Sequence, residues 1–207
     1  MSGGLAILGA GGHGRVVADC ADALGWQRIV FFDDRHDVAL ETPWSVAGTG
    51  EDLMAQASAF DAVVVAVGNN RMRLELLLAL RSVGARLATL IHPRATVSGR
   101  SVIGPGSVVI AGAVVNIGAR VGQGVIVNTG ATVDHDCVLE DGVHVAPGAH
   151  LAGGVRVGKE SWIGVGAVVR EYTFVGEGAF VGAGAVVVAS IDAGLKVVGN
   201  PARQIRR

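Results

Sequence analysis

Residues 121–145 read VGQGVIVNTGATVDHDCVLEDGVHV, and an aliphatic residue stands at every sixth position of this stretch. The same spacing continues in both directions without a slip. Sixteen consecutive positions follow it: Val97, Ile103, Val109, Val115, Val121, Val127, Val133, Leu139, Val145, Leu151, Val157, Ile163, Val169, Val175, Val181 and Val187. Because aliphatic residues are a minority of an ordinary chain, a run of this length indicates a structural repeat rather than chance.

The period of six excludes an α-helix and a single long strand. Six-residue steps on an α-helix rotate by about 240°, which would scatter these side chains over three directions. An even spacing keeps them on one face of an extended chain, but strands usually run about 3–10 residues, so the chain must turn regularly. Glycines three residues after most of the aliphatic positions supply turns: Gly106, Gly112, Gly118, Gly124, Gly130, Gly142, Gly148, Gly154, Gly166, Gly178 and Gly184. The pattern predicts a parallel β-helix with aliphatic side chains inside.

Composition narrows the class of protein. The 207 residues suffice for one large domain or two small ones, and the net charge of −1 gives no reason to expect nucleic acid or an anionic membrane as partner. The longest apolar runs are too short to span a bilayer, and the first residues lack the features of a signal peptide. The two cysteines do not suggest a disulfide framework. We therefore expect a soluble cytoplasmic protein.

Before the repeat, short apolar runs alternate with helical patterns, which predicts an α/β domain with a parallel sheet. The predicted elements are strands at residues 5–8, 29–32, 62–67 and 87–91 and helices at 15–24 and 72–80.

A glycine-rich turn links the first strand to the first helix. Gly9, Gly11 and Gly14 form G-x-G-x-x-G, and Asp33 lies about 20 residues later, as in dinucleotide-binding domains. Such a turn brings backbone N–H groups and a helix N-terminus against phosphate. The domain has only about half the usual length of an NAD-binding fold, so we expect another phosphate-bearing ligand. The alternative is a turn with a purely structural role.

Asp134-His135-Asp136 stands out in a part of the repeat that has few charges. Asp136 occupies a place where the repeat prefers glycine, and positions that break a local rule are where function is expected. A histidine can accept a proton near pH 7 if a carboxylate orients it, and either aspartate qualifies. The alternative is a solvated corner. Cys137 reads more simply as a small residue at a tight turn than as a nucleophile.

The order of motifs resembles one enzyme family along essentially the whole chain. GAGGHGRVV at residues 9–17, FFDD at 31–34 and VGNN at 67–70, ahead of a hexapeptide repeat, look like the sialic acid O-acetyltransferases and the bacillosamine and perosamine N-acetyltransferases. The resemblance implies a left-handed β-helix with three hexads per coil and homotrimers with active sites between neighbouring helices. It also implies an N-terminal Rossmann-like α/β domain, residues 1–92, for a nucleotide-linked sugar and a β-helix domain, residues 93–207, for acyl transfer.

The resemblance also assigns site residues. Its nucleotide-sugar contacts fall on Gly12, His13, Gly14, Asp33, Asp34 and Gly68. His135 becomes the general base and Asp136 its partner. The acyl-CoA contacts fall on His144, Val165 and Ala183. His150 has no such support and is expected on the surface. VGNPAR at 198–203 resembles the loop that closes over CoA, with Arg206 and Arg207 either at the CoA phosphates or in a solvated tail.

We therefore expect an acetyl-CoA-dependent, metal-free acetyltransferase of polysaccharide biosynthesis that acts on the amine of a nucleotide-linked amino sugar. Two alternatives share the fold: an O-acetyltransferase of the sialic acid type, and a module that binds sugar nucleotides without catalysis. A γ-type carbonic anhydrase is disfavoured, because the close histidine pair that helps to hold zinc in that family is missing here.

Overall fold

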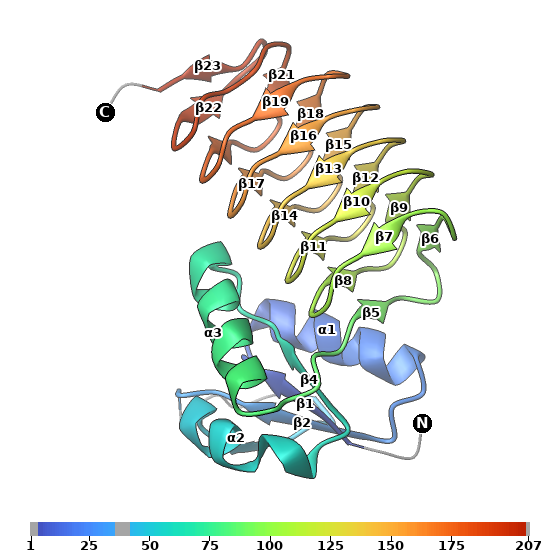
Figure 1. Ribbon diagram of the computed structural model, residues 1–207, viewed down its shortest axis with the longest axis vertical. Helices are drawn as coiled ribbons and strands as arrows, with labels where there is room; N and C mark the ends of the chain where they lie inside the picture. Colours follow the sequence, from blue (N-terminus) through green and yellow to red (C-terminus); the bar gives the residue numbers. More distant parts are fainter. Residues whose placement is uncertain (1–3, 36–41, 206–207) are drawn as a thin grey trace.

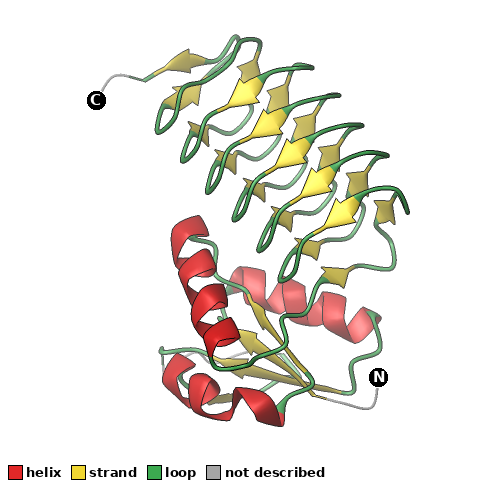
Figure 2. Ribbon diagram, in the orientation of Figure 1, coloured by secondary structure: helices red, strands yellow, loops and turns green. Residues whose placement is uncertain are grey.

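The computed structural model describes residues 4–35 and 42–205, which form an α/β domain below a long stack of short strands (Figure 1). The α/β domain has a parallel four-stranded sheet in the order β3-β2-β1-β4. Helices lie on its two faces (Figure 2). Its elements are β1 (Gly4–Leu8), α1 (Gly12–Ala23), β2 (Arg28–Phe32), β3 (Val46–Gly48), α2 (Gly50–Gln56), a 3₁₀ turn (Ala57–Ala59), β4 (Ala62–Val65) and α3 (Asn70–Ser82).

The stack is the left-handed parallel β-helix that the resemblance implies, with three sheets named here after one strand each. The β14 face comprises β5 (Leu90–Ile91), β8 (Val108–Val109), β11 (Ile126–Val127), β14 (His144–Val145), β17 (Trp162–Ile163), β20 (Phe180–Val181), β22 (Lys196–Val198) and the antiparallel β23 (Arg203–Gln204). The β15 face comprises β6 (Thr96–Val97), β9 (Val114–Val115), β12 (Thr132–Val133), β15 (His150–Leu151), β18 (Val168–Val169) and β21 (Val186–Val187). The β13 face comprises β7 (Val102–Ile103), β10 (Arg120–Val121), β13 (Val138–Leu139), β16 (Arg156–Val157) and β19 (Phe174–Val175).

The six-residue spacing is confirmed strand by strand. Each of the sixteen aliphatic positions is the second residue of a two-residue strand, and those from Val109 to Val187 are at most 3% exposed. Val97 and Ile103 in the first coil are only partly buried, because no coil lies beneath them. The chain visits the β14, β15 and β13 faces in turn, so a residue 18 positions away lies directly above or below on the next coil.

The corners need left-handed backbone, which explains the glycines. The eleven corner glycines predicted from the repeat all have φ between +60° and +75°. Only three corner residues with positive φ are not glycine in the part of the chain that is described: Asp136, Glu160 and Tyr172, with φ of 59°, 59° and 54°. A non-glycine residue in this region costs about 1 kcal/mol or more. Asp136 therefore breaks the backbone rule, as its place in the repeat predicts.

Two parts of the α/β domain differ from expectation. The apolar run at 87–91 is divided, because Leu87 bridges Val63 beside β4 whereas Leu90–Ile91 pairs with β8. The β-helix sheet thus begins at Leu90, slightly before the expected boundary at 92. Strand β3 and helix α2 were not predicted. The signal for α2 was present in the sequence, since Thr49 and Asp52 form a capping box at its start.

Arg73 of α3 joins the two domains. Its side chain is 1% exposed, and its guanidinium donates to Gly124 O at 2.7 Å and Gly142 O at 2.8 Å, on successive coils. It also donates to Val67 O at 2.9 Å, at the end of β4. Burial lowers the pKa of Arg73 to about 10, so the group is still a cation at neutral pH. Carbonyl and amide oxygens, not a carboxylate, hold this buried charge.

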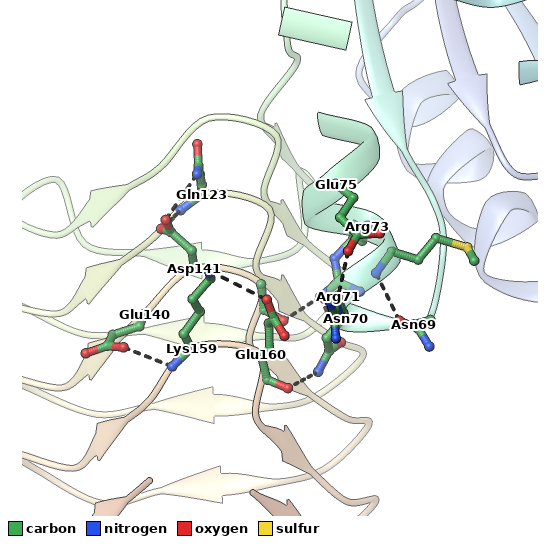
Figure 3. Close-up of polar contacts among 12 residues, drawn as sticks. Asn69, Asn70, Arg71, Arg73, Glu75, Gln123, Glu140, Asp141, Lys159 and Glu160 are labelled. Atoms are coloured by element: carbon green, nitrogen blue, oxygen red, sulfur yellow. Dashed lines mark hydrogen bonds and ion pairs between the residues drawn. The ribbon is translucent and has the colours of Figure 1, made fainter. Parts of the chain in front are cut away.

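Neighbouring side chains of α3 extend the junction. Asn70 accepts from Arg73 at 2.9 Å and donates to Glu160 O and Ser161 O at 3.0 Å each, and Figure 3 shows both side chains between α3 and the coils. A Cβ atom on Gly106 or Gly142 would lie 2.8 Å or 2.7 Å from the leucines of α3. The corner glycines therefore also let α3 lie directly on the β-helix.

Replacement of Arg73 by methionine is expected to lower the free energy of unfolding by about 3 kcal/mol, because two buried carbonyl oxygens and one part-buried carbonyl oxygen lose their donor. Chemical denaturation with hydrogen-exchange mass spectrometry measures this loss and its location at α3 and the 124 and 142 corners. Arg71→Ala, which removes an exposed side chain paired with Glu75, is the control and should change stability by under about 0.5 kcal/mol. Equal stability of the two variants would contradict this account of the junction.

Candidate active site

A pocket of about 430 Å³ opens at the carboxyl ends of β1 and β4. This is the edge of a parallel sheet where ligands bind in open α/β folds. The pocket is lined by Leu8, Gly9, Gly11, Gly12, His13, Asp33, Asp34, Arg35, Gly50, Ala66, Val67, Gly68, Met72 and Leu76. Five of the six residues predicted to contact the nucleotide-linked sugar therefore lie together. The sixth, Gly14, is not in the lining.

The glycines of the turn are glycine for different structural reasons. Gly9 has φ of 107°, and a Cβ there would lie 2.9 Å from Ala66 O. A Cβ on Gly14 would collide with Gly9 O, so Gly14 lets α1 pack against the end of β1. Gly12 and Gly68 face open space. Helix α1 has no side-chain cap and no acidic residue in its first turn, so its first N–H groups are available to an anion.

The two aspartates that follow β2 already have partners. Asp33 is 8% exposed; its Oδ2 accepts from Ala10 N and Arg35 Nη2 and its Oδ1 from Arg35 N and Nε, at 2.8–3.0 Å. The Arg35 side chain holds the pKa of Asp33 well below its usual range. Asp34 Oδ1 accepts from Gly50 N at 2.8 Å, at the start of α2. The sequence analysis did not single out Arg35, although its place directly after the aspartates was a signal.

The predicted base lies at a corner of the β-helix. His135 and Asp136 sit between β12 and β13, and His135 Nδ1 is 2.9 Å from Asp136 Oδ2. A carboxylate only accepts, so Nδ1 carries the hydrogen and Nε2 of the neutral ring is left with a free lone pair. The Asp136 hydrogen bond is the chief reason that the pKa of His135 is raised above 6.5. Gly153 of the next coil makes room for Nε2, because a Cβ there would collide with it.

The structure separates the roles of the two aspartates, which the sequence left open. Asp134 Oδ1 accepts from His135 N at 2.7 Å and from Asn116 Nδ2 at 2.8 Å. Both bonds lower the pKa of Asp134, and the bond from His135 N has the larger effect. Asp134 therefore links the backbone of the corner to Asn116 of the coil below, and Asp136 holds the imidazole ring.

His144 is buried where the β14 face meets the α/β domain. It points out of the β-helix, as expected, but is only 5% exposed; its Nε2 lies 3.1 Å from Asn128 Nδ2 and its ring 4.2 Å from that of Trp162. The His13 ring of the pocket lies 6.2 Å away. Sequence reasoning missed Asn128, which no charge or rule-breaking position marks.

Burial makes these two histidines unlike His135. Desolvation, followed by the charge of Arg73, lowers the pKa of His13 to about 4 and that of His144 to about 3. Both are neutral at physiological pH. His13 Nε2 and His144 Nδ1 are buried and find no hydrogen-bond partner among the described residues. They are free to bind a polar ligand, whereas His135 is the histidine poised to take up a proton.

The remaining predicted acyl-CoA residues lie on a different edge from His135. Val165 and Ala183 occupy successive corners between the β14 and β15 faces, joined by the Gly184 N to Val165 O hydrogen bond of 2.8 Å. The His135 corner joins the β15 and β13 faces and is therefore opposite the β14 face. The α/β domain packs on the β14 face, where Val17 of α1 shares a hydrophobic cluster with Val108 and Ile126. One chain does not bring the pocket and His135 together.

Other expectations are resolved by burial. Cys137 is fully buried, as a small packing residue would be, and desolvation raises the pKa of its thiol to about 11. His150 is exposed on the β15 face, as expected, with Nδ1 2.9 Å from Thr132 Oγ1.

Arg206 and Arg207 lie outside the described residues. Across residues 4–35 and 42–205, no helix has the length and apolar character needed to cross a membrane.

Comparison with known proteins places this architecture. Residues 4–80 match the family model of the PglD N-terminal domain. The acetyltransferase domain of PglB from Neisseria gonorrhoeae, solved with acetyl coenzyme A, is 50% identical; the match covers 99% of this chain and 100% of that one with a TM-score of 0.95.

A second enzyme matches over the same length. PerB from Caulobacter crescentus, in complex with CoA and GDP-perosamine, is 37% identical, with 99% of this chain and 98% of that chain covered and a TM-score of 0.91. The chain thus belongs to the hexapeptide-repeat sugar acetyltransferases that include the PglB acetyltransferase domain and GDP-perosamine N-acetyltransferase.

Proposed function

We propose that the protein transfers an acetyl group from acetyl-CoA to the amine of a nucleotide-linked amino sugar, with His135 as general base and Asp136 as its partner. The His135–Asp136 pair carries the proposal. The bond to Asp136 fixes the tautomer of His135, leaves its Nε2 free and raises its pKa. The pocket on the α/β domain supports a nucleotide-linked acceptor. The match to a structure that holds both CoA and GDP-perosamine supports this pair of substrates.

The chemistry needs one proton acceptor and no acyl-enzyme. The amine nitrogen attacks the thioester carbonyl carbon while His135 Nε2 takes a proton from the amine. The tetrahedral intermediate then collapses, the C–S bond breaks, and the imidazolium returns its proton to the CoA thiolate. Asp136 stabilises the imidazolium between these steps. Alignment of the two substrates lowers the barrier by several kcal/mol, and general-base help typically adds about 10²–10⁴-fold.

An amine is favoured over a hydroxyl as acceptor by the relatives. The matched Caulobacter enzymes are N-acetyltransferases of GDP-perosamine, and two of their structures retain CoA and GDP-perosamine although a histidine is replaced by alanine or asparagine. Retention of both ligands after replacement of a histidine is the behaviour expected here of His135, which lines neither the pocket nor the Val165 corner. On this basis we place the reaction on an amino sugar.

The separation of His135 from the pocket supports a homotrimer with shared active sites. His135 of one copy would meet the pocket, His144 and the Val165–Ala183 corner of the next copy. Large apolar side chains around the His135 corner are exposed in the single chain, with Ile117 at 52%, Tyr172 at 77% and Phe174 at 47%. A neighbouring copy would cover them.

The domain roles follow from the same proposal. Residues 1–92 would hold the nucleotide-linked sugar and residues 93–207 the acyl donor. Because acetyl-CoA and nucleotide-linked sugars are cytoplasmic metabolites, we place the reaction in the cytoplasm. Such sugars are precursors of bacterial glycans, which supports a role in polysaccharide biosynthesis.

Replacement of His135 by alanine is expected to lower kcat by about 10²–10⁴-fold with little change in KM for either substrate, because the base is lost and the binding residues remain. The measurement is CoA release from acetyl-CoA with a panel of UDP-, GDP- and dTDP-linked 4-amino sugars. His92→Ala, remote from the proposed site, is the control. Turnover that survives in His135→Ala would sink the mechanism, and a wild-type enzyme that acts on none of these amino sugars would sink the N-acetyl assignment.

Replacement of Asp136 by asparagine is expected to move the acid limb of the kcat/KM profile to lower pH. His135 acts in its neutral form, so activity falls as the pH drops through its raised pKa, and the Asp136 hydrogen bond is the largest cause of that rise. The plateau should also fall, because the imidazolium loses its anionic partner. A plateau that falls while the limb stays in place would show that Asp136 does not set the pKa of His135.

A further inference from the structure

Arg35 presents a fixed cation to the nucleotide pocket. Its Nε and Nη2 form a fork on the Asp33 carboxylate, at 2.9 Å and 2.8 Å, while the side chain as a whole is 66% exposed. A guanidinium has five N–H hydrogens, and this fork uses two of them. The other three N–H hydrogens of Arg35 are outside this fork, and Arg35 lines the pocket.

The partner of Arg35 decides what else it can bind. Asp33 is buried and accepts four hydrogen bonds, which saturates the usual lone-pair directions of a carboxylate. It therefore orients Arg35 and cannot itself bind a ligand while the fork is intact. Asp34 Oδ1 is engaged with Gly50 N. Arg35 therefore supplies hydrogen-bond donors on this side of the pocket.

Arg35 also lies over the glycine turn. A Cβ placed on Gly11 would be 3.5 Å from Arg35 Nη2, so the guanidinium stands directly above the start of α1. The side chain and the turn then face the same volume, and both contribute donors. Guanidinium and phosphate match in charge and in bidentate geometry.

We propose that Arg35 binds the diphosphate of the nucleotide-linked sugar and makes the pocket selective for diphosphates over monophosphates and nucleosides. Asp33 is then a positioning residue that acts through Arg35. This inference rests on the proposed function, since it takes a nucleotide-linked sugar as the ligand of the pocket.

Binding of free nucleotides to the full-length protein tests this without turnover. Isothermal titration calorimetry with UDP, GDP and dTDP identifies the diphosphate that wild type binds most tightly, and the matching monophosphate and nucleoside complete the series. The variants are Arg35→Ala, Asp33→Asn and the double variant. Arg86→Ala, at the opposite edge of the sheet beside Asp61, is the control for loss of a surface arginine.

Arg35→Ala is expected to weaken diphosphate binding by at least about tenfold, monophosphate binding less and nucleoside binding not at all, because charge-assisted bonds to phosphate are lost. The same change should still weaken diphosphate binding in the Asp33→Asn background. If it has no effect there, Arg35 serves only to neutralise Asp33, and the proposal is wrong. Unchanged or tighter diphosphate binding by Arg35→Ala also overturns it.

These outcomes separate this proposal from the proposed function. If wild type binds a diphosphate and Arg35→Ala binds it equally well, the Arg35 assignment fails and the nucleotide-linked acceptor stands. If wild type binds none of the three diphosphates, both fail together. Thermal denaturation of each variant distinguishes loss of affinity from loss of fold.

Discussion

A buried arginine that donates to carbonyl oxygens determines how the two halves of the protein meet. Arg73 donates hydrogen bonds to the carbonyl of Val67, just after β4, and to two successive corners of the β-helix, so one side chain joins the chain after β4 to the β-helix. The two corner contacts are buried, and those carbonyls would lose their donor without it. The α/β domain is therefore fixed on the β14 face. Its pocket faces that side, and the His135 corner lies opposite.

Two different environments give the histidines different protonation behaviour. His13 and His144 lie in the desolvated junction near the Arg73 charge, which keeps both rings neutral and leaves a nitrogen of each free for a ligand. His135 lies at an open corner against Asp136, which favours its protonated form. That partner adopts a left-handed conformation at a corner where the repeat usually places glycine. Local strain is thus accepted at the residue that orients the His135 ring.

The sequence predicted what repeats and what breaks the repeat. The six-residue period located sixteen strands, and the missing glycine at Asp136 marked the corner of the proposed base. The glycine turn and the aspartates at the end of β2 located most of the pocket. Arg73 and Asn128 were not found, because their partners are distant carbonyl oxygens and a residue 16 positions away, and such long-range polar contacts leave no periodic pattern. Arg35 was overlooked although its partner Asp33 lies only two residues away. The choice between Asp134 and Asp136 likewise needed the geometry of the corner.

The central claim is that each active site combines the pocket of one chain with His135 of another. Mixed oligomers of two inactive variants test it most directly. His135→Ala removes the base, and Gly12→Glu places a carboxylate where Gly12 faces open space in the pocket. Co-expressed and purified together, the two should recover about one quarter of wild-type activity, since random assembly pairs an intact pocket with an intact base at about that frequency. A mixed oligomer that forms and stays as inactive as its parents would contradict a shared site.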